Sequence, residues 1–406
     1  MADVTYAPPA DIDLCRSRAL LAGVVGLVAC GIGFVVDRDH FFRSWLIAYL
    51  LFLGIALGSL GLLMIQHLSG GAWGVFRRIF EASSRTLPLL ALLFLPVILG
   101  MPNLYPWTHP GHVQQDEVLR HRAAYLNTGF FLSRALVCFA GWILLAWALT
   151  RWSRRQDEGD PRADLRLQYL SGSGLVFYTF SATVAAIDWI MSINPHWYST
   201  LYGFIFVGGH GISALSFTII VSTFLARRPP LNAVLRPSHF HDLGKLSLAF
   251  VMLWAYFNFS QYMLTYAANV VEEIPYFIAR ISHGWQYLAL FLVVFQFAVP
   301  FLLLLSRSLK RVPHRLVWVS VGLLVVRYLD LFMLVSPDFD AASGANLHLL
   351  DGEHASRIFV HWLDLAAPLA IGGLWVWMFF TQLARRPLVA FADPHLRDAL
   401  EATGGY

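Results

Sequence analysis

Seven ionisable side chains lie inside apolar, helix-length runs of this 406-residue chain. They are two arginines, three aspartates and two histidines: Arg134, Asp188, His210, Arg327, Asp330, His361 and Asp364. A charge near a bilayer centre is costly, so such residues are candidates for function. Carboxylate and imidazole groups take up and release protons, and a neighbouring arginine adjusts their pKa. These residue types suit a proton relay, or a quinol site in which a side chain accepts the hydroxyl proton.

Four of these residues form two pairs with helical spacing. Arg327 and Asp330 are three residues apart, and His361 and Asp364 repeat that spacing, so each pair is predicted to share one helix face. Each could equally be a structural pair that compensates its own charge. The spacing alone leaves both interpretations open.

His210 is flanked by glycines that would let a neighbouring helix or a ligand approach the backbone: Gly208, Gly209 and Gly211. A lone histidine on an apolar helix is more often a core residue with satisfied hydrogen bonds. His210 and His361 could also ligate a haem, but neither belongs to a specific haem-binding pattern. Haem is therefore the least favoured of these interpretations.

The composition is that of a membrane protein. Hydrophobic residues make up 57% of the chain and charged residues 13%, whereas a soluble domain carries about 25% charged residues. The formal charge of +4 comes from basic residues in short loops, so nucleic acid is not an expected partner. Arg16 and Arg18 precede an apolar run that ends without a small-residue cleavage site, which predicts a retained first span rather than a signal peptide.

Ten apolar runs are long enough to cross a bilayer as helices, which predicts an all-α integral membrane protein. The predicted spans are residues 18–36, 42–64, 86–102, 123–149, 172–192, 201–225, 245–269, 284–305, 315–335 and 358–384. Pro88, Pro96 and Pro102 are expected to kink or shorten the third span. A cytoplasmic N-terminal segment (1–17) and a cytoplasmic tail (385–406) are expected to flank the ten-helix domain (18–384).

The basic residues set the expected orientation. Most of the 29 Lys and Arg residues lie in the N-terminal segment, in alternate loops and after the last span, which predicts that both termini are cytoplasmic. The seven ionisable residues then fall in or near the outer leaflet, together with Gln261 of the seventh span. This clustering favours function over inert structure and predicts a polar path from the outer surface to about the bilayer midplane.

Polar residues on the opposite side could form a cytoplasmic mouth. His67 ends the second span, and His241, Asp242 and Lys245 begin the seventh. Ordinary interface residues would have the same pattern, and Lys245 is well placed to extend its amine to the interface.

Two connecting segments have a pattern of their own. In residues 72–85, aromatic residues and arginines recur at helical spacing, which predicts a short helix lying on the membrane interface. The outer segment 103–122 is expected to cover the outer surface, or to anchor it through its aromatic residues.

The cysteines encode no redox centre. Cys15, Cys30 and Cys138 are too scattered for an iron–sulfur run, a C-x-x-C-H haem attachment or a disulfide framework. The chain is therefore expected to bind no redox cofactor and no metal of its own.

The middle of the chain resembles a known family. The runs that carry the resemblance are Asp188–Ser192 (DWIMS), His241–Lys245 (HDLGK), Phe250–Phe257 (FVMLWAYF), Phe259–Gln261 (FSQ) and Glu272–Pro275 (EEIP). They resemble the F subunit of alternative complex III, which is similar to the NrfD/polysulfide-reductase membrane family. The resemblance covers residues 15–385 and is most specific over 172–290.

The resemblance implies a place in a quinol:electron-acceptor oxidoreductase of the bacterial cytoplasmic membrane. The implied partners are a multihaem cytochrome c subunit, an iron–sulfur subunit and an NrfD-like sister subunit, with lipids between them. Haem c and iron–sulfur clusters would reside in those partners, and the better-supported site for menaquinol or ubiquinol would lie in the sister subunit. The implied fold has two four-helix bundles, helices 2–5 and 6–9, flanked by helices 1 and 10.

The sequence thus predicts a non-redox membrane subunit that lines a proton path and scaffolds the quinol-oxidising sister subunit, with no catalytic residue of its own. Three alternatives stay open: quinol binding by this chain, a stand-alone secondary transporter, and a scaffold with inert polar pairs. A transporter would show interrupted helices at corresponding positions of two repeats. Only the proline-rich third span is expected to be interrupted, and the sequence shows no counterpart to it.

Overall fold

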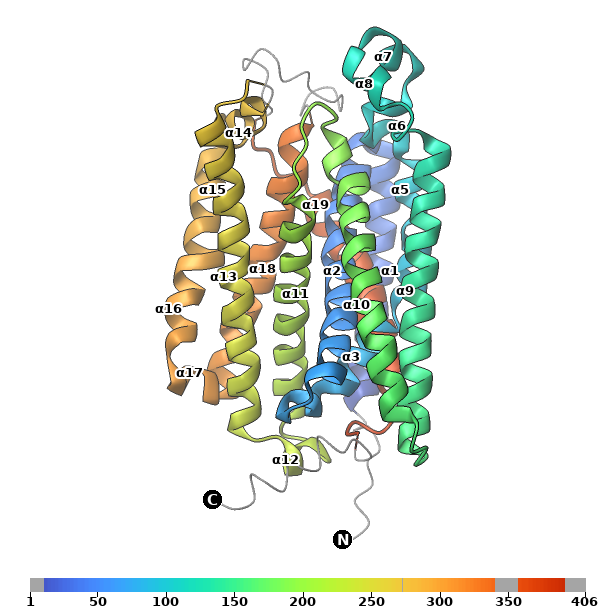
Figure 1. The fold of residues 1–406 in the computed structure, drawn as a ribbon, viewed down its shortest axis with the longest axis vertical. Coiled ribbons are helices and arrows are strands. Elements are labelled where there is room, and N and C mark those ends of the chain that lie inside the picture. Colours follow the sequence, from blue (N-terminus) through green and yellow to red (C-terminus); the bar gives the residue numbers. More distant parts are fainter. Residues whose placement is uncertain (1–10, 272, 340–356, 391–406) are drawn as a thin grey trace.

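The computed structural model describes residues 11–271, 273–339 and 357–390. Within these ranges the chain forms helices and no strand, and ten segments are long and apolar enough to cross a membrane. The helices stand side by side in one body (Figure 1). An all-α fold with ten candidate spans is therefore confirmed. Parts of the predicted terminal segments, and Glu272, lie outside the described residues.

The ten spans follow the predicted ones closely except at a few ends. They are Asp11–Val36 (α1), Arg38–Ser69 (α2), Trp73–Leu99 (α3 to α5), Thr128–Asp157 (α9), Ala163–Ile193 (α10, Ala163–Trp189, and a 3-10 turn), Tyr202–Leu225 (α11), Pro237–Ala268 (α13), Trp285–Leu305 (α15 to α16), Pro313–Asp338 (α18, Pro313–Val335, and a 3-10 turn) and Leu363–Leu383 (α19). The largest difference is in the third span, which begins at Trp73 rather than at residue 86.

The third span is a series of short helices, as its prolines predict. α3 (Arg77–Ser84), α4 (Leu87–Leu93) and α5 (Leu95–Leu99) follow one another, and Pro88 and Pro96 stand in the first turns of α4 and α5. Proline lacks an N–H group, so it fits the first turn of a helix, whereas in the interior it removes a main-chain hydrogen bond. The predicted short helix forms, but its predicted position on the membrane interface is wrong, because every side chain of α3 is buried inside the protein.

The eighth span contains an interruption that the sequence did not predict. α15 (Trp285–Leu292) passes through a π-helical segment (Val293–Ala298) into α16 (Val299–Leu305). Pro300 stands in the first turn of α16 and has no N–H group to donate to the carbonyl of Gln296 four residues earlier. This missing hydrogen bond gives a local reason for the wider turn.

Helices α2 and α11 form the interior. Of the most apolar stretch of each helix, 94% is buried in α2 and 83% in α11, against 22% in α1. α11 packs on α2, α10, α13 and α18, whereas α1 packs mainly on α19. The apolar faces of α1, α13 and the eighth span therefore point outward, as expected for helices surrounded by lipid.

Short helices mark the two ends of the body. α6 (Met101–Leu104), α7 (Pro110–Gln115), α8 (Glu117–Arg122) and α14 (Ile274–Ile281) lie at one end, which we call the α7/α8 end (Figure 1). α12 (Leu231–Val234), α17 (Arg307–Arg311), the start of α1 and the end of α19 lie at the opposite, α12/α17 end. The predicted outer segment 103–122 thus forms a cap over one end.

Candidate functional site

The residues predicted for the polar path lie in the half of the protein next to the α7/α8 end. His210 is eight residues from the start of α11, and Arg327 is eight residues from the end of α18. At 1.5 Å per residue both lie about 12 Å from that end. The other predicted residues of the path are closer to it.

Arg134 of α9 and Asp188 of α10 form a bidentate ion pair. Nε and Nη2 of Arg134 lie 2.6 and 3.0 Å from the two carboxylate oxygens. The guanidinium also covers the rings of Tyr125 and Phe130, 3.9 and 4.2 Å from their centroids. The sequence analysis named Arg134 and Asp188 as separate candidates, but in the structure they form one ion pair in which each neutralises the other. This pair fits a role in holding α9 against α10.

His210 of α11 is only 1% exposed. Its Nδ1 lies 3.1 Å from the hydroxyl oxygen of Tyr178 of α10. Its Nε2 is buried and has no hydrogen-bond partner among the described residues. The ring can sit this close to α2 because Gly54 has no side chain, and a Cβ there would lie 3.2 Å from Cδ2 of the imidazole. A buried histidine whose second ring nitrogen has no hydrogen-bond partner can accept or donate a proton at that nitrogen.

Arg327 and Asp330 share one face of α18 and form an ion pair, as their spacing predicts. The indole Nε1 of Trp254, on α13, donates to Asp330 Oδ2 at 3.0 Å. The guanidinium of Arg327 lies against Gly209 of α11, where a Cβ would overlap with it. The pair on α18 is therefore a close neighbour of His210, the next residue along α11.

Asp364 joins α19 to α2. Its Oδ1 accepts a hydrogen bond from the Ser44 hydroxyl at 2.6 Å, and its Oδ2 lies 3.8 Å from Nη2 of Arg43. Arg43 is 5% exposed, and its Nε and Nη2 have no hydrogen-bond partner among the described residues. The sequence did not single out Arg43, because its place at the edge of a span is typical of a loop residue.

His361 lies before the last helix rather than on it. α19 begins at Leu363, so the predicted helix face shared by His361 and Asp364 is wrong. Instead, the main-chain N–H of His361 donates to Asp364 Oδ2 at 2.8 Å. The His361 ring faces that of His40, with centroids 4.8 Å apart. Partial burial and the adjacent His40 lower the pKa of His361.

Gln261 connects α13 to the segment before α11. Its carbonyl oxygen accepts a hydrogen bond from the Ser199 hydroxyl, and its amide donates to Thr265 Oγ1 at 3.4 Å. The amide oxygen and the amide nitrogen of Gln261 therefore both have hydrogen-bond partners, which fits a structural role in holding these two segments together.

The predicted cytoplasmic mouth is divided between two places. His67 is buried, and its Nδ1 lies 2.9 Å from the Ser171 hydroxyl between α2 and α10. Asp242 and Lys245 pair at 3.3 Å along the more exposed start of α13, where His241 is half-buried. Among the residues that the structure describes, no hydrogen bond or ion pair joins His67 to this group.

A buried charge network that the sequence did not predict links α3 to α9. Glu81 is 2% exposed and lies 3.0 Å from Arg77 Nε and 2.7 Å from Arg78 Nη1. Ser153 donates to Glu81 at 2.6 Å, and Arg78 also pairs with Asp157 at 2.5 Å. The Arg-Arg-x-x-Glu spacing was the available signal, because residues three and four apart meet on a helix.

Arg280 and Asp338 form another buried pair that the sequence did not predict. Nη2 of Arg280, on α14, lies 2.7 Å from Asp338 Oδ2, and it also donates to the Leu334 carbonyl at 3.1 Å. The pair fastens α14, at the α7/α8 end, to the end of α18.

No protein-family model matches this chain, and no curated protein matches it either.

Proposed function

We propose that this chain is a non-redox, multi-pass membrane subunit of a quinol-oxidising respiratory or photosynthetic complex, alternative complex III, in the bacterial cytoplasmic membrane. Ten candidate spans with exposed apolar faces support the membrane setting. The resemblance of residues 172–290 supports this particular complex. Its haem c and iron–sulfur clusters would belong to partner subunits, and the main quinol site to an NrfD-like sister subunit.

The proposal includes the bundle arrangement and the orientation. Spans 2–5 and 6–9 would form two four-helix bundles, with α1 and α19 beside them and both termini in the cytoplasm. Contacts of α9 with α10, of α11 with α13 and α18, and of α1 with α19 support this arrangement. The distribution of Lys and Arg supports the orientation.

The role that we propose for the polar residues is to line part of a proton path. The observation that carries it is the buried His210, with its unpartnered Nε2, next to the Arg327–Asp330 pair. The imidazole would exchange a proton at Nε2 while Tyr178 holds Nδ1, and Arg327 and Asp330 would stabilise its charge states. We assign Arg134 and Asp188 a structural role, since each neutralises the charge of the other and forms two hydrogen bonds with it.

The test uses the complex purified through a tag on this chain. We expect haem-containing partners to copurify and to colour the preparation. His210→Gln is expected to leave the haem content unchanged and to lower proton translocation by about 100-fold or more, the usual scale for losing a proton-transfer group. Ser216→Ala, a buried change farther along α11, is the control.

Normal proton translocation in the His210→Gln complex would rule out the relay role. A colourless chain that purifies alone and transports a solute would instead favour the secondary transporter. The interrupted third and eighth spans do not occupy corresponding positions of the two proposed bundles, so they do not favour that alternative.

One observation favours quinol binding by this chain as a second candidate function. An apolar cavity of about 490 Å³ lies between α13 and the π-helical segment, lined by Trp254, Asn258 and Phe297. This volume is in the range of small-molecule sites, and Trp254 connects the cavity to Asp330. A photoreactive quinone should label this lining if the second function is correct, and should label only the sister subunit if it is not.

A further inference from the structure

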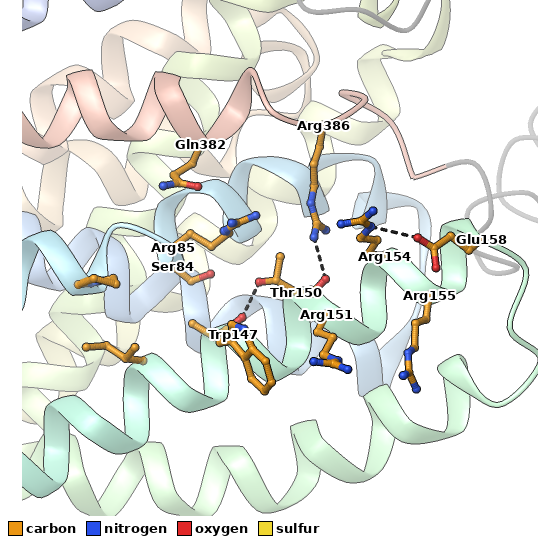
Figure 2. A pocket seen from close by; sticks show the side chains of 13 residues that line it. Ser84, Arg85, Trp147, Thr150, Arg151, Arg154, Arg155, Glu158, Gln382 and Arg386 are labelled. Carbon is orange, nitrogen blue, oxygen red and sulfur yellow. Dashed lines mark hydrogen bonds and ion pairs between the residues drawn. The ribbon is translucent and has the colours of Figure 1, made fainter.

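A cavity of about 560 Å³ lies near the α12/α17 end, far along α9 from Arg134. It is bordered by α9, by the junction of α3 and α4, and by the residues that follow α19 (Figure 2). Its lining contains five arginines and one acid: Arg85, Arg151, Arg154, Arg155, Arg386 and Glu158. It is independent of the polar path and is not needed for the proposed function.

The positive charge in this cavity is only partly compensated. Arg154 pairs with Glu158 at 3.0 Å, and Arg386 lies 3.4 Å from Glu81, which Arg77 and Arg78 already contact. The side chain of Arg85 forms no hydrogen bond or ion pair with the residues that the structure describes. The pKa of Arg386 lies below its ordinary value because of burial and the nearby cations, although Glu81 opposes this shift. The lining of the cavity therefore carries an excess of positive charge.

In Figure 2 the guanidinium group of Arg386 points toward Thr150, whose main-chain carbonyl accepts a hydrogen bond from it at 3.0 Å. The guanidinium group of Arg154 lies beside that of Arg386 and pairs with Glu158, and Arg85 extends from the other side of the cavity. The planar guanidinium group presents several N–H donors, which match the oxygens of a phosphate.

The wall of the cavity becomes apolar along α9 toward the membrane interior. Ile143, Ala146 and Trp147 continue the lining, and Trp147 is 56% exposed. Leu144, one turn back, is also exposed. A basic mouth followed by an exposed apolar helix face fits an amphiphile better than a soluble anion, because a soluble anion has no apolar part to pack against the apolar wall.

We propose that this cavity binds an anionic phospholipid. The headgroup phosphate contacts Arg85, Arg154 and Arg386, and an acyl chain lies along α9 past Trp147. Arg151, whose guanidinium carbon lies 5.2 Å from the Trp147 ring centroid, adds positive charge at the rim.

Native mass spectrometry of the full chain in mild detergent can measure this binding. The probes are phosphatidylglycerol, phosphatidylcholine with the same acyl chains, and inorganic phosphate. We expect phosphatidylglycerol to bind more tightly than phosphatidylcholine. Arg85→Gln with Arg154→Gln should weaken phosphatidylglycerol binding about 30-fold, from about 1 kcal/mol for each cation. Phosphatidylcholine binding should change little.

Two variants sharpen the test. Arg307→Gln with Arg315→Gln removes two exposed cations from the same end but outside the cavity, and should leave phosphatidylglycerol binding nearly unchanged. Glu158→Gln removes the acid and should strengthen binding. This second variant keeps the test valid even if the double arginine variant fails to fold.

Three results would overturn the proposal. They are equal affinity for the two lipids, wild-type phosphatidylglycerol binding by a folded Arg85→Gln, Arg154→Gln variant, and no gain with Glu158→Gln. Tight binding of inorganic phosphate without any preference for phosphatidylglycerol would identify a soluble-anion site instead.

Discussion

Arg134 and Asp188 show how a charged side chain is tolerated inside this protein. Each compensates the other at 2.6 and 3.0 Å, so neither is left unpaired in an apolar environment. Arg327 with Asp330 follows the same rule. Because desolvating an unpaired ion costs far more than desolvating a matched pair, the pairs should be sensitive to the loss of one partner.

We predict that Asp188→Asn destabilises the protein by about 3–5 kcal/mol, because it leaves the Arg134 guanidinium without a counter-ion. Arg134→Met with Asp188→Leu should recover most of that loss. Thermal unfolding in detergent measures both, with the exposed Glu117→Gln as control. Equal stability of Asp188→Asn and the wild type would show that the pair does not fix α9 on α10.

Gly209 offers a second test at the scale of one residue. A Cβ at this position would overlap with the Arg327 guanidinium, so Gly209→Ala is expected to cost about 1–3 kcal/mol and to displace Arg327. Gly208→Ala is the matched control, because its Cβ would meet only Phe257 at 3.6 Å. If both variants unfold at the same temperature, Arg327 is not held against α11.

At the level of single helices, the stability of a short helix depends on the residues that cap its ends. α8 begins after Asp116, whose carboxylate accepts the N–H groups of Val118 and Leu119 at 2.8 and 3.2 Å. It also lies 2.7 Å from His196 Nε2. Although partial burial opposes it, these hydrogen bonds and His196 hold the pKa of Asp116 below its ordinary value.

We predict that Asp116→Ala weakens α8 locally by about 1 kcal/mol, the usual value of a helix cap. Because the pKa of Asp116 is lower in the folded state, its stabilisation is fully present above about pH 4, the pKa of an unfolded aspartate, and is lost as the pH falls through the folded value. Hydrogen exchange of the α8 amides, corrected for intrinsic rates, measures both effects. Glu117→Gln, which leaves the cap intact, should behave as the wild type.

The sequence pattern around α3 predicted a helix at the membrane interface, whereas α3 is buried in the protein. The aromatic residues and arginines of residues 72–85 are typical of an interfacial helix, yet Glu81 pairs with the arginines of α3, and every side chain of α3 is buried. The sequence of this short segment cannot reveal the residues of α9 that pair with its charged side chains.

At the scale of the whole molecule, the distribution of basic residues predicts the orientation. With Cys15, Cys30 and Cys138 replaced by serine, a membrane-impermeant thiol reagent added outside spheroplasts should label Gln114→Cys in α7. It should label Ser308→Cys in α17 only after the membrane is opened. The opposite labelling would place the α12/α17 end outside.

The all-α class, the ten candidate spans and the breaks at Pro88 and Pro96 follow from the sequence alone. So does the position of the ionisable residues toward one end, because that follows from counting residues along each helix. These features depend on length, apolar content and proline chemistry, which are local properties of the chain.

Which polar side chains contact one another depends on how the helices pack. Asp188 pairs with Arg134 and Asp364 with Ser44, across 54 and 320 residues. Helix rotation and neighbours set these contacts, and an apolar helix surrounded by lipid carries no amphipathic pattern that fixes its rotation. The same reason explains why Arg43 and Arg280, both at the edges of spans in the sequence, turned out to be buried in the folded chain.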